Sequence, residues 1–338
     1  MAAIDPNLHI AGGGCRLEDF ALFEGPDLGS IAAVDPGCQD VVADIVADHA
    51  ANDSLTSTHY YFLSELQPFL GENCEHLPCF LKAVSSSTLG HSTLIVDRHC
   101  TLTEPLVLPS RFTLAGVGID GEGGLSFSGL ADGVSAIRFA PEARNVMIRD
   151  LAIGRADGGV NAGIDFSRAQ KVYARNVQVT NFFAGIYGSR PSLFAIYVYL
   201  DHCNAFDNDY NLVIHRNAFH WRIRDCILSQ ANCWGLLIFG PRNDPAPRPV
   251  NRNFGWGNDH LISGCSFEGC GTGGVHLGSD SAMLINNRFE NNGGVGGVGV
   301  QIFSTAARTR LVSNYLSGNI IHEEAGAQDT QEWGTILL

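Results

Sequence analysis

Five residues of the types that move protons lie within or just after short apolar segments of this sequence. Asp165, Tyr187 and His276 stand inside such segments, His215 ends another, and Arg190 follows the segment that holds Tyr187. Histidine, tyrosine and a carboxylate can each take or give a proton, and arginine stabilises the negative charge that develops. If the fold brings these side chains to one surface, they could remove the proton beside the carboxylate of an acidic sugar.

The segments that carry these residues are predicted to be strands with one buried face. They read GIDF (163–166), GIYG (185–188), NLVIH (211–215), GLLIF (235–239), GVHL (274–277) and GVQIF (299–303). The second residue of each is apolar, the third varies, and the fourth is apolar except at Gly188. Because successive side chains of a strand point to opposite faces, Asp165, Tyr187 and His276 should share one outward row. His215 belongs to the adjacent row, beside Arg190 or Arg216.

A longer repeat runs through the same region, with mostly apolar residues at positions 0, +3 and +5. It is filled by Ile148, Leu151 and Ile153; Ala174, Val177 and Val179; Ala195, Val198 and Leu200; Ile223, Cys226 and Leu228; Ile262, Cys265 and Phe267; Leu284, Asn287 and Phe289; and Leu311, Asn314 and Leu316. The middle members are 21 to 28 residues apart, except for one step of 39 that contains an insertion at 241–259. This period predicts a solenoid of about eight coils, roughly 40 Å long at ~4.8 Å per coil. Asn287 and Asn314 share one repeat position and predict an asparagine ladder. A β-sandwich with regular strand spacing is the alternative fold.

The segment STLIVDRHCTLTEPLVLPSRFTLAGVG (92–118) resembles the opening coil of the pectate-lyase-like β-helix superfamily. MLINNRFENNGG (283–294) is similar to the later repeats of that fold, and the resemblance covers about two-thirds of the chain. It implies an all-β protein, a single-stranded right-handed parallel β-helix over residues 92–322. The superfamily includes lyases, hydrolases, epimerases, transferases and non-catalytic adhesins, so the resemblance does not choose a chemistry. Many of its members associate as trimers, which leaves a homo-oligomer open.

The two ends of the chain do not repeat. Residues 1–91 are expected to form an N-terminal extension and helical cap, because the end of a solenoid exposes core and unpaired strand edges. QDVVADIVADHAA (39–51) and THYYFLSELQPFL (58–70) have helical spacing. Residues 323–338 are expected to form a C-terminal tail that caps the other end or supports association.

The insertion 241–259 is a second candidate region, because long loops that interrupt a regular fold often carry function. Its Arg248 and Arg252 could bind a carboxylate, and its Trp256 could stack on a sugar ring. Phe239 and Arg216 would extend this substrate-binding surface on the outward face. The alternative is a tolerated surface loop with no role.

The segment DHCNAFDNDYN (201–211) is rich in carboxylates that would suit calcium. No calcium motif of the lyases matches it, so an ordinary polar turn is the favoured interpretation, and no metal or cofactor is predicted. AFDNDYN is also similar to a motif of mannuronan epimerases, but it lacks the histidine that follows there.

Composition excludes some classes of partner. A formal net charge of −14 argues against nucleic acid, whose phosphates require a basic surface. No apolar run is long enough to span a membrane, and no signal peptide is apparent at the N-terminus. Several of the ten cysteines occupy core positions of the repeat, which favours buried reduced thiols and a cytoplasmic location.

Three functions are consistent with these patterns. The first is a carbohydrate-active enzyme that acts on an acidic glycan by lyase or epimerase chemistry on the outer face of the β-helix. The second is an intracellular isomerase or cyclase that encloses a less polar small molecule in an aromatic pocket. The third is a non-catalytic binding solenoid, in which the outward polar residues do not converge.

Overall fold

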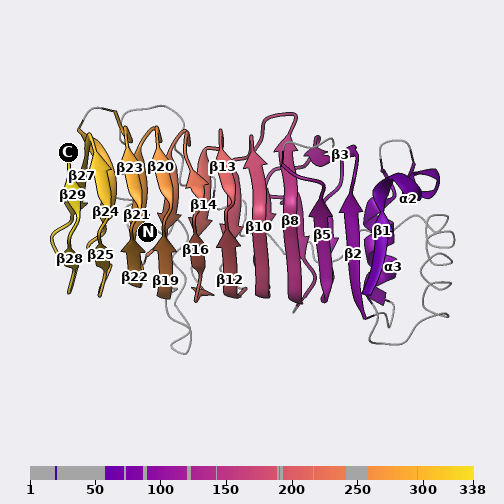
Figure 1. Ribbon diagram of the computed structural model, residues 1–338, viewed down its shortest axis with the longest axis horizontal. Coiled ribbons are helices and arrows are strands. Elements are labelled where there is room, and N and C mark those ends of the chain that lie inside the picture. The colour runs from indigo at the N-terminus through magenta and orange to yellow at the C-terminus, as the bar shows by residue number, and fades with distance from the viewer. Residues whose placement is uncertain are drawn as a thin grey trace.

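The computed structural model shows a rod of stacked strands with a helical cap at one end (Figure 1). It describes residues 20, 58–71, 74–86, 90–119, 123–141, 143–188, 190, 193–215, 217–240, 258–294 and 296–338, and every structural statement below concerns these. Neighbouring strands are parallel throughout, as in the pairing of β10 (Gln170–Thr180) with β12 (Ala195–Asp201). The fold is the predicted right-handed parallel β-helix.

Two sheets form the walls of the rod, and the twenty-stranded one, called sheet A here, bends around a corner to supply two faces. Its first face contains β1 (Thr58–Phe62), β2 (His91–Val96), β5 (Phe112–Gly116), the start of β8 (Arg144–Arg155), the start of β10, β12, β15 (Ala218–Phe219), β16 (Arg222–Arg224), β19 (Asn258–Ser263), β22 (Asp280–Ile285), β25 (Arg310–Val312) and β28 (Gln331–Trp333). Its second face contains β3 (His99–Leu102), β6 (Gly124–Phe127), the ends of β8 and β10, β13 (Asn204–Phe206), β17 (Ile227–Leu228), β20 (Ser266–Glu268), β23 (Arg288–Glu290), β26 (Tyr315–Ser317) and β29 (Ile336–Leu337).

The nine-stranded sheet, called sheet B, forms the remaining face. It contains β4 (Leu106–Leu108), β7 (Ile137–Phe139), β9 (Ala162–Asp165), β11 (Ala184–Gly188), β14 (Tyr210–Ile214), β18 (Trp234–Ile238), β21 (Gly273–Leu277), β24 (Gly297–Ile302) and β27 (Asn319–Glu323). The six strands predicted from the glycine-opened segments are β9, β11, β14, β18, β21 and β24, in the predicted register.

Residues with left-handed backbone conformation mark the corners of the coils. One such row precedes the first face and has φ between 54° and 59°: Arg111, Asn145, Lys171, Tyr197, His220, Asp259, Ser281, Arg308 and Asp329. A second row bends sheet A between its two faces: Asp150, Asn176, His202, Asp225, Gly264, Asn286, Ser313 and Gly334. Asparagine, aspartate and glycine are the residues that accept this conformation most readily, so they fill most of the second row. The first row, which we call the corner row, is less typical, because it includes a tyrosine.

The apolar repeat fills the interior, with one correction to its register. Ala174 pairs with Leu200 and Val179 with Ala205, so the third coil contributes Leu200, Cys203 and Ala205 to the core. The predicted members, Ala195, Val198 and Leu200, are also buried and have the same spacing. The corner between the faces decides the register, because His202 bends this coil where Asn176 bends the previous one.

Polar ladders run along the core. The Asn287 side chain donates a hydrogen bond to Asn314 Oδ1 at 3.0 Å, which confirms the predicted asparagine ladder. Asn292 and Asn319 form a second one at 2.9 Å. The first ladder continues to Cys265, whose backbone N–H donates to Asn287 Oδ1 at 2.9 Å. These bonds satisfy buried backbone groups at corners where the strand pairing is interrupted.

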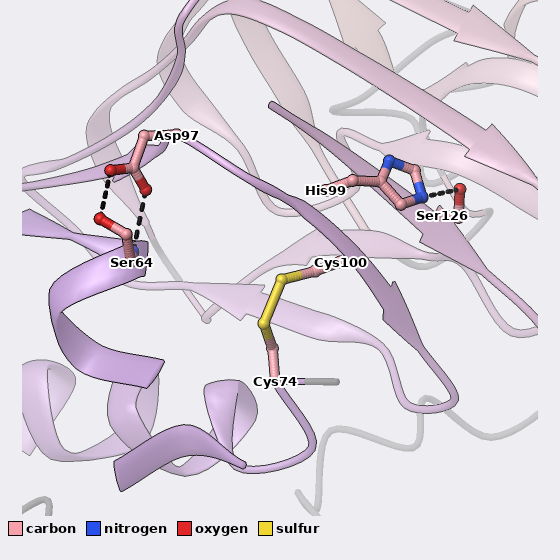
Figure 2. Close-up of a disulfide and its surroundings, with 6 residues drawn as sticks. All are labelled: Ser64, Cys74, Asp97, His99, Cys100 and Ser126. Atoms are coloured by element: carbon pink, nitrogen blue, oxygen red, sulfur yellow. Dashed lines mark hydrogen bonds between the residues drawn. A yellow bond between two sulfur atoms is a disulfide. The ribbon is translucent and has the colours of Figure 1, made fainter. Parts of the chain in front are cut away.

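The cap consists of α2 (Leu63–Leu70) and α3 (Leu77–Ser86), and it is tied to the first coils (Figure 2). Asp97 accepts a hydrogen bond from the backbone N–H of Ser64 at 2.9 Å, so its carboxylate satisfies the N-terminus of α2. A disulfide joins Cys74, between the helices, to Cys100 in β3. Neither helix is long and apolar enough to cross a membrane.

The boundaries of the solenoid differ from the expected 92–322. THYYF, expected to be helical, is strand β1 and pairs with β2, while QDVVADIVADHAA lies outside the described residues. The predicted tail 323–338 contains β28 and β29, which add a further coil to sheet A. The strands at both ends pair with their neighbours and continue sheet A. They are too short for their alternation to be recognised in the sequence.

Cysteine pairing also differs from the expectation. Besides the Cys74–Cys100 pair, Cys79 and Cys233 each belong to a further disulfide. Four other cysteines are buried free thiols, as predicted: Cys203, Cys226, Cys265 and Cys270.

Candidate functional site

The predicted outward row on sheet B exists but is buried. Asp165, Tyr187 and His276 occupy equivalent positions of β9, β11 and β21, with Val213 and Leu237 between the last two. Tyr187 and His276 are 0% exposed and Asp165 is 2% exposed. The row therefore does not form the open surface that the sequence suggested.

An aromatic cluster explains this burial. The ring of Phe20 lies 4.8 Å from that of Phe183, 5.0 Å from Tyr210, 5.3 Å from Phe239 and 6.1 Å from Tyr187. Phe20 thus fills the middle of the outer surface of sheet B and makes a second core there. Phe239, a predicted substrate-binding residue, is one of its packing partners. The aromatic side chains expected to enclose a small molecule enclose Phe20 instead.

The two predicted histidines of this face lie in the same apolar surroundings. The His215 ring lies 4.6 Å from Phe239 and 6.3 Å from Tyr187. The His276 ring lies 5.3 Å from Trp234 and 5.0 Å from Phe303. Burial lowers the pKa of His276 to about 4, so this side chain is neutral at pH 7. Neither histidine is accessible to a polymer.

Arg190 and Asp165 form a closed ion pair. Arg190 Nε donates to Asp165 Oδ2 at 2.8 Å, Ser135 Oγ donates to the same oxygen at 3.1 Å, and Arg190 Nη2 donates to the Gly133 carbonyl at 3.0 Å. Burial alone would lower the pKa of Arg190, but the Asp165 carboxylate raises it, so the guanidinium stays charged. These contacts tie neighbouring turns together and leave the carboxylate 3% exposed. Arg216, Arg248, Arg252 and Trp256 lie outside the described residues.

An open groove of about 450 Å³ lies instead on the first face of sheet A, across β8, β10, β12, β16 and β19. Two outward rows of side chains line it. The first row is Met147, Tyr173, Tyr199, Arg222 and Leu261, and the second includes Arg175, Asp201, Arg224 and Ser263. Tyr173 and Tyr199 stack with ring centroids 4.6 Å apart and planes 8° apart. Tyr173 is 43% exposed, so the pair offers an aromatic surface to solvent.

Charged side chains follow the second row at one per coil. Arg149, Arg175, Asp201 and Arg224 are in register, about 4.8 Å apart from coil to coil. Arg224 Nε donates to Asp201 Oδ1 at 2.8 Å, and Arg175 Nε lies 3.6 Å from Asp201 Oδ2. Burial alone would raise the pKa of Asp201, but Arg224 and His202 hold it below the usual value. The side chains of Arg175 and Arg224 are 69% and 64% exposed, so both can reach a ligand.

The corner row brings a second set of groups to the edge of this groove. His220 Nδ1 lies 2.6 Å from Asp259 Oδ2, and Arg222 Nη2 donates to the same oxygen at 2.9 Å. The His220 ring stacks on Tyr197 with centroids 4.9 Å apart. Burial alone would raise the pKa of Asp259, but the hydrogen bonds from His220 and Arg222 lower it, so this carboxylate stays ionised.

Asp201, His202 and Asp225 form a group whose ligand atoms lie within 4.8 Å of one another. Asp201 is already bound to Arg224, and an arginine beside a carboxylate repels a cation. The calcium that the acidic segment 201–211 suggested gains no support from this arrangement.

The sequence carries a signal for the sheet A groove in three strands that the predicted register does not align. The strands VYARNV, YVYLDH and WRIRDC alternate apolar residues with tyrosine, arginine and aspartate. Their outward members, such as Tyr173 and Arg175, recur at equivalent places in successive coils. The misassigned register of the third coil hid this alignment, because it separated Tyr199 and Asp201 from their neighbours.

Comparison with solved structures agrees with the fold. The chain is similar to the Dettilon tailspike protein gp208 (13% identity, TM-score 0.57), over 77% of this chain and 51% of that one. It is also similar to the A-module of the Azotobacter vinelandii mannuronan C-5 epimerase AlgE4 (14% identity, TM-score 0.51), over 78% of this chain and 92% of that one. A third is the tailspike gp49 of Acinetobacter baumannii bacteriophage Fri1, a capsular polysaccharide depolymerase (13% identity, TM-score 0.50), over 82% of this chain and 55% of that one.

These likenesses define the class of protein as a right-handed parallel β-helix. The chain spans about half the length of both tailspikes. No family model and no curated protein matches the sequence.

Proposed function

We propose that this chain binds an acidic glycan in the sheet A groove and acts on it by proton transfer, as a lyase or an epimerase. The observation that carries the proposal is the stacked pair Tyr173 and Tyr199 beside the exposed Arg175 and Arg224. Aromatic faces pack against the apolar faces of sugar rings, and guanidinium groups bind carboxylates with two parallel hydrogen bonds. The two surfaces lie on one open face of the rod.

The shape of the groove suits a polymer. The rows run along the axis of the solenoid, perpendicular to the strands, so a chain laid along the rod meets a new set of side chains about every 4.8 Å. Asp201 and Asp225 stand among the arginines and can accept hydrogen bonds from sugar hydroxyls. The mixture of both charges favours a substrate with hydroxyls as well as carboxylates over a simple polyanion.

The comparisons support the same substrate class by analogy. Two of the similar structures are a mannuronan C-5 epimerase module and a capsular polysaccharide depolymerase. At 13% to 14% identity such a likeness concerns the fold, so the proposed function depends mainly on the side chains of the groove.

Binding of uronate polymers tests this proposal. We expect wild-type protein to bind polygalacturonate or polymannuronate and not neutral dextran. Arg224→Ala should weaken that binding about five- to tenfold, because it removes an exposed charge-assisted contact of about 1 kcal/mol. Arg288→Ala is the matched control, since Arg288 is 58% exposed on the second face of sheet A. Equal binding by all three proteins, or none by the wild type, would refute the assignment.

A non-catalytic binding solenoid is the second candidate, favoured by the exposure of the groove. It predicts binding of the same polymers without any change in their length or stereochemistry. Size-exclusion chromatography and proton NMR of the polymer after incubation distinguish the two.

A further inference from the structure

We propose that His220 is the general base of the reaction in the sheet A groove and that Asp259 is its positioning residue. This inference rests on the proposed function. His220 belongs to the corner row, which lies at the edge of the groove and not among its lining residues. His220 is joined to the lining residue Arg222 through Asp259.

The contacts of Asp259 fix the orientation of the imidazole. Its Oδ2 lies 2.6 Å from His220 Nδ1 and accepts a hydrogen bond from Arg222 Nη2 at 2.9 Å, while its backbone carbonyl accepts one from Arg222 Nη1 at 2.6 Å. A carboxylate beside Nδ1 selects the tautomer that has its proton there. Nε2 then carries the lone pair and can accept a proton.

The ring plane is set by a second contact. Tyr197 stacks on His220 with centroids 4.9 Å apart and planes 9° apart, and the His220 side chain is 38% exposed. The ring is therefore held on two sides and open to solvent on part of its surface. A base needs both features, because it must be positioned and must also reach the substrate.

The backbone conformation of the corner row brings these three side chains together. Tyr197, His220 and Asp259 occupy consecutive coils with φ of 58°, 58° and 59°, the left-handed conformation that the whole row shares. At a corner, the side chain leaves the strand pleat and stands at the edge of the groove beside Arg222.

Four other histidines of the described chain are less suited to act as the general base. His215, His260 and His276 are at most 2% exposed, so no polymer can reach them. His202 Nδ1 lies 3.3 Å from its carboxylate partner, Asp201 Oδ1, whereas His220 Nδ1 lies 2.6 Å from Asp259 Oδ2. His220 is therefore held more closely by its carboxylate, and its ring also stacks on Tyr197.

The proposed step removes the proton from C5 of a uronate unit. His220 Nε2 takes this proton, and the electron pair of the C–H bond moves toward the carboxylate to give an enolate, which an arginine of the groove stabilises. In a lyase the pair then forms the C4–C5 double bond as the C4–O bond breaks, and the leaving oxygen takes a proton from water. In an epimerase C5 instead takes a proton from water on its opposite face, and the imidazolium of His220 returns its proton to the solvent.

The test measures turnover and binding on the same polyuronates. Unsaturated ends are followed by ultraviolet absorbance, and deuterium entry at C5 is followed by NMR in heavy water. We expect His220→Ala to lower kcat at least a hundredfold with a KM change below threefold, and added imidazole to restore part of the rate. Asp259→Asn should lower kcat about tenfold or more, and Asp259→Glu should recover part of it. His322→Ala, an exposed histidine at the end of sheet B, should behave as wild type.

The outcomes separate the two proposals. If the wild type turns over a polyuronate and His220→Ala keeps its kcat, or loses it without imidazole rescue, the assignment of the base is wrong while the proposed function stands. If the wild type binds a polyuronate but changes neither its length nor its C5 hydrogens, both the proton transfer and the base are refuted. If it binds none of the probes, the proposed function fails first.

Discussion

Acid should destabilise this fold through two fully buried histidines. Burial lowers the pKa of His260 to about 3 and that of His276 to about 4, against about 6.5 in an unfolded chain. The charges of Arg222 and His220 lower the pKa of His260 further, and Asp259 opposes them. Since the folded pKa values are depressed, the unfolded chain binds more protons between pH 6.5 and the folded values, and stability falls as pH falls through that window.

The size of the effect follows from the pKa difference. Between pH 7.5 and pH 5 each histidine lowers the free energy of unfolding by about 2 kcal/mol, so the two together lower it by about 4 kcal/mol. That is a large part of the roughly 5–15 kcal/mol by which proteins are stable. His260→Leu removes one titrating group, and it should reduce the difference in unfolding free energy between pH 7.5 and pH 5 by about 2 kcal/mol.

Urea unfolding at the two pH values measures this difference. His322→Leu is the matched control, because it makes the same substitution at an exposed histidine. If the wild type and His260→Leu lose the same unfolding free energy between pH 7.5 and pH 5, the core histidine is not the cause and the reasoning fails.

Three further predictions concern the packing of the rod. Gly188→Ala should destabilise it by about 1–3 kcal/mol in urea unfolding, because a Cβ there would lie 2.4 Å from the Trp221 ring; an unchanged midpoint would contradict this. Asn287→Ala should cost about 1–3 kcal/mol by leaving the Cys265 backbone N–H unsatisfied, and calorimetry should show a lower Tm. Removal of the Cys74–Cys100 disulfide by paired serine substitutions should cost about 3–4 kcal/mol for its 26-residue separation, and an unaltered Tm would show that the cap does not depend on it.

Local alternation was enough to predict most of the fold. The alternation in sheet B follows from a period of two within each strand, and the asparagine ladder follows from the longer repeat, which places Asn287 and Asn314 at one repeat position. Gly188, the exception in that alternation, is explained only by the structure, which places Trp221 where its side chain would be. In the third coil, residues 195, 198 and 200 and residues 200, 203 and 205 have the same spacing, and both sets are buried. The spacing in the sequence therefore could not distinguish the correct register from the wrong one.

The site was harder to predict, since it depends on which outward face is covered. Alternation shows that Tyr187 points outward, but it cannot show that Phe20, from far earlier in the chain, packs on it. The contact between His220 and Asp259 could not be predicted either, because the insertion separates the two residues by 39 positions in the sequence. Contacts between distant segments decide both outcomes.

The central claim is that sheet A, and not sheet B, carries the ligand. A crystal structure of the protein with a bound oligouronate tests it most directly. We expect the sugar rings to lie along the first face of sheet A against Tyr173 and Tyr199, with a carboxylate bound by Arg175 or Arg224. An oligosaccharide bound on sheet B after displacement of Phe20, or on the second face of sheet A, would contradict the account.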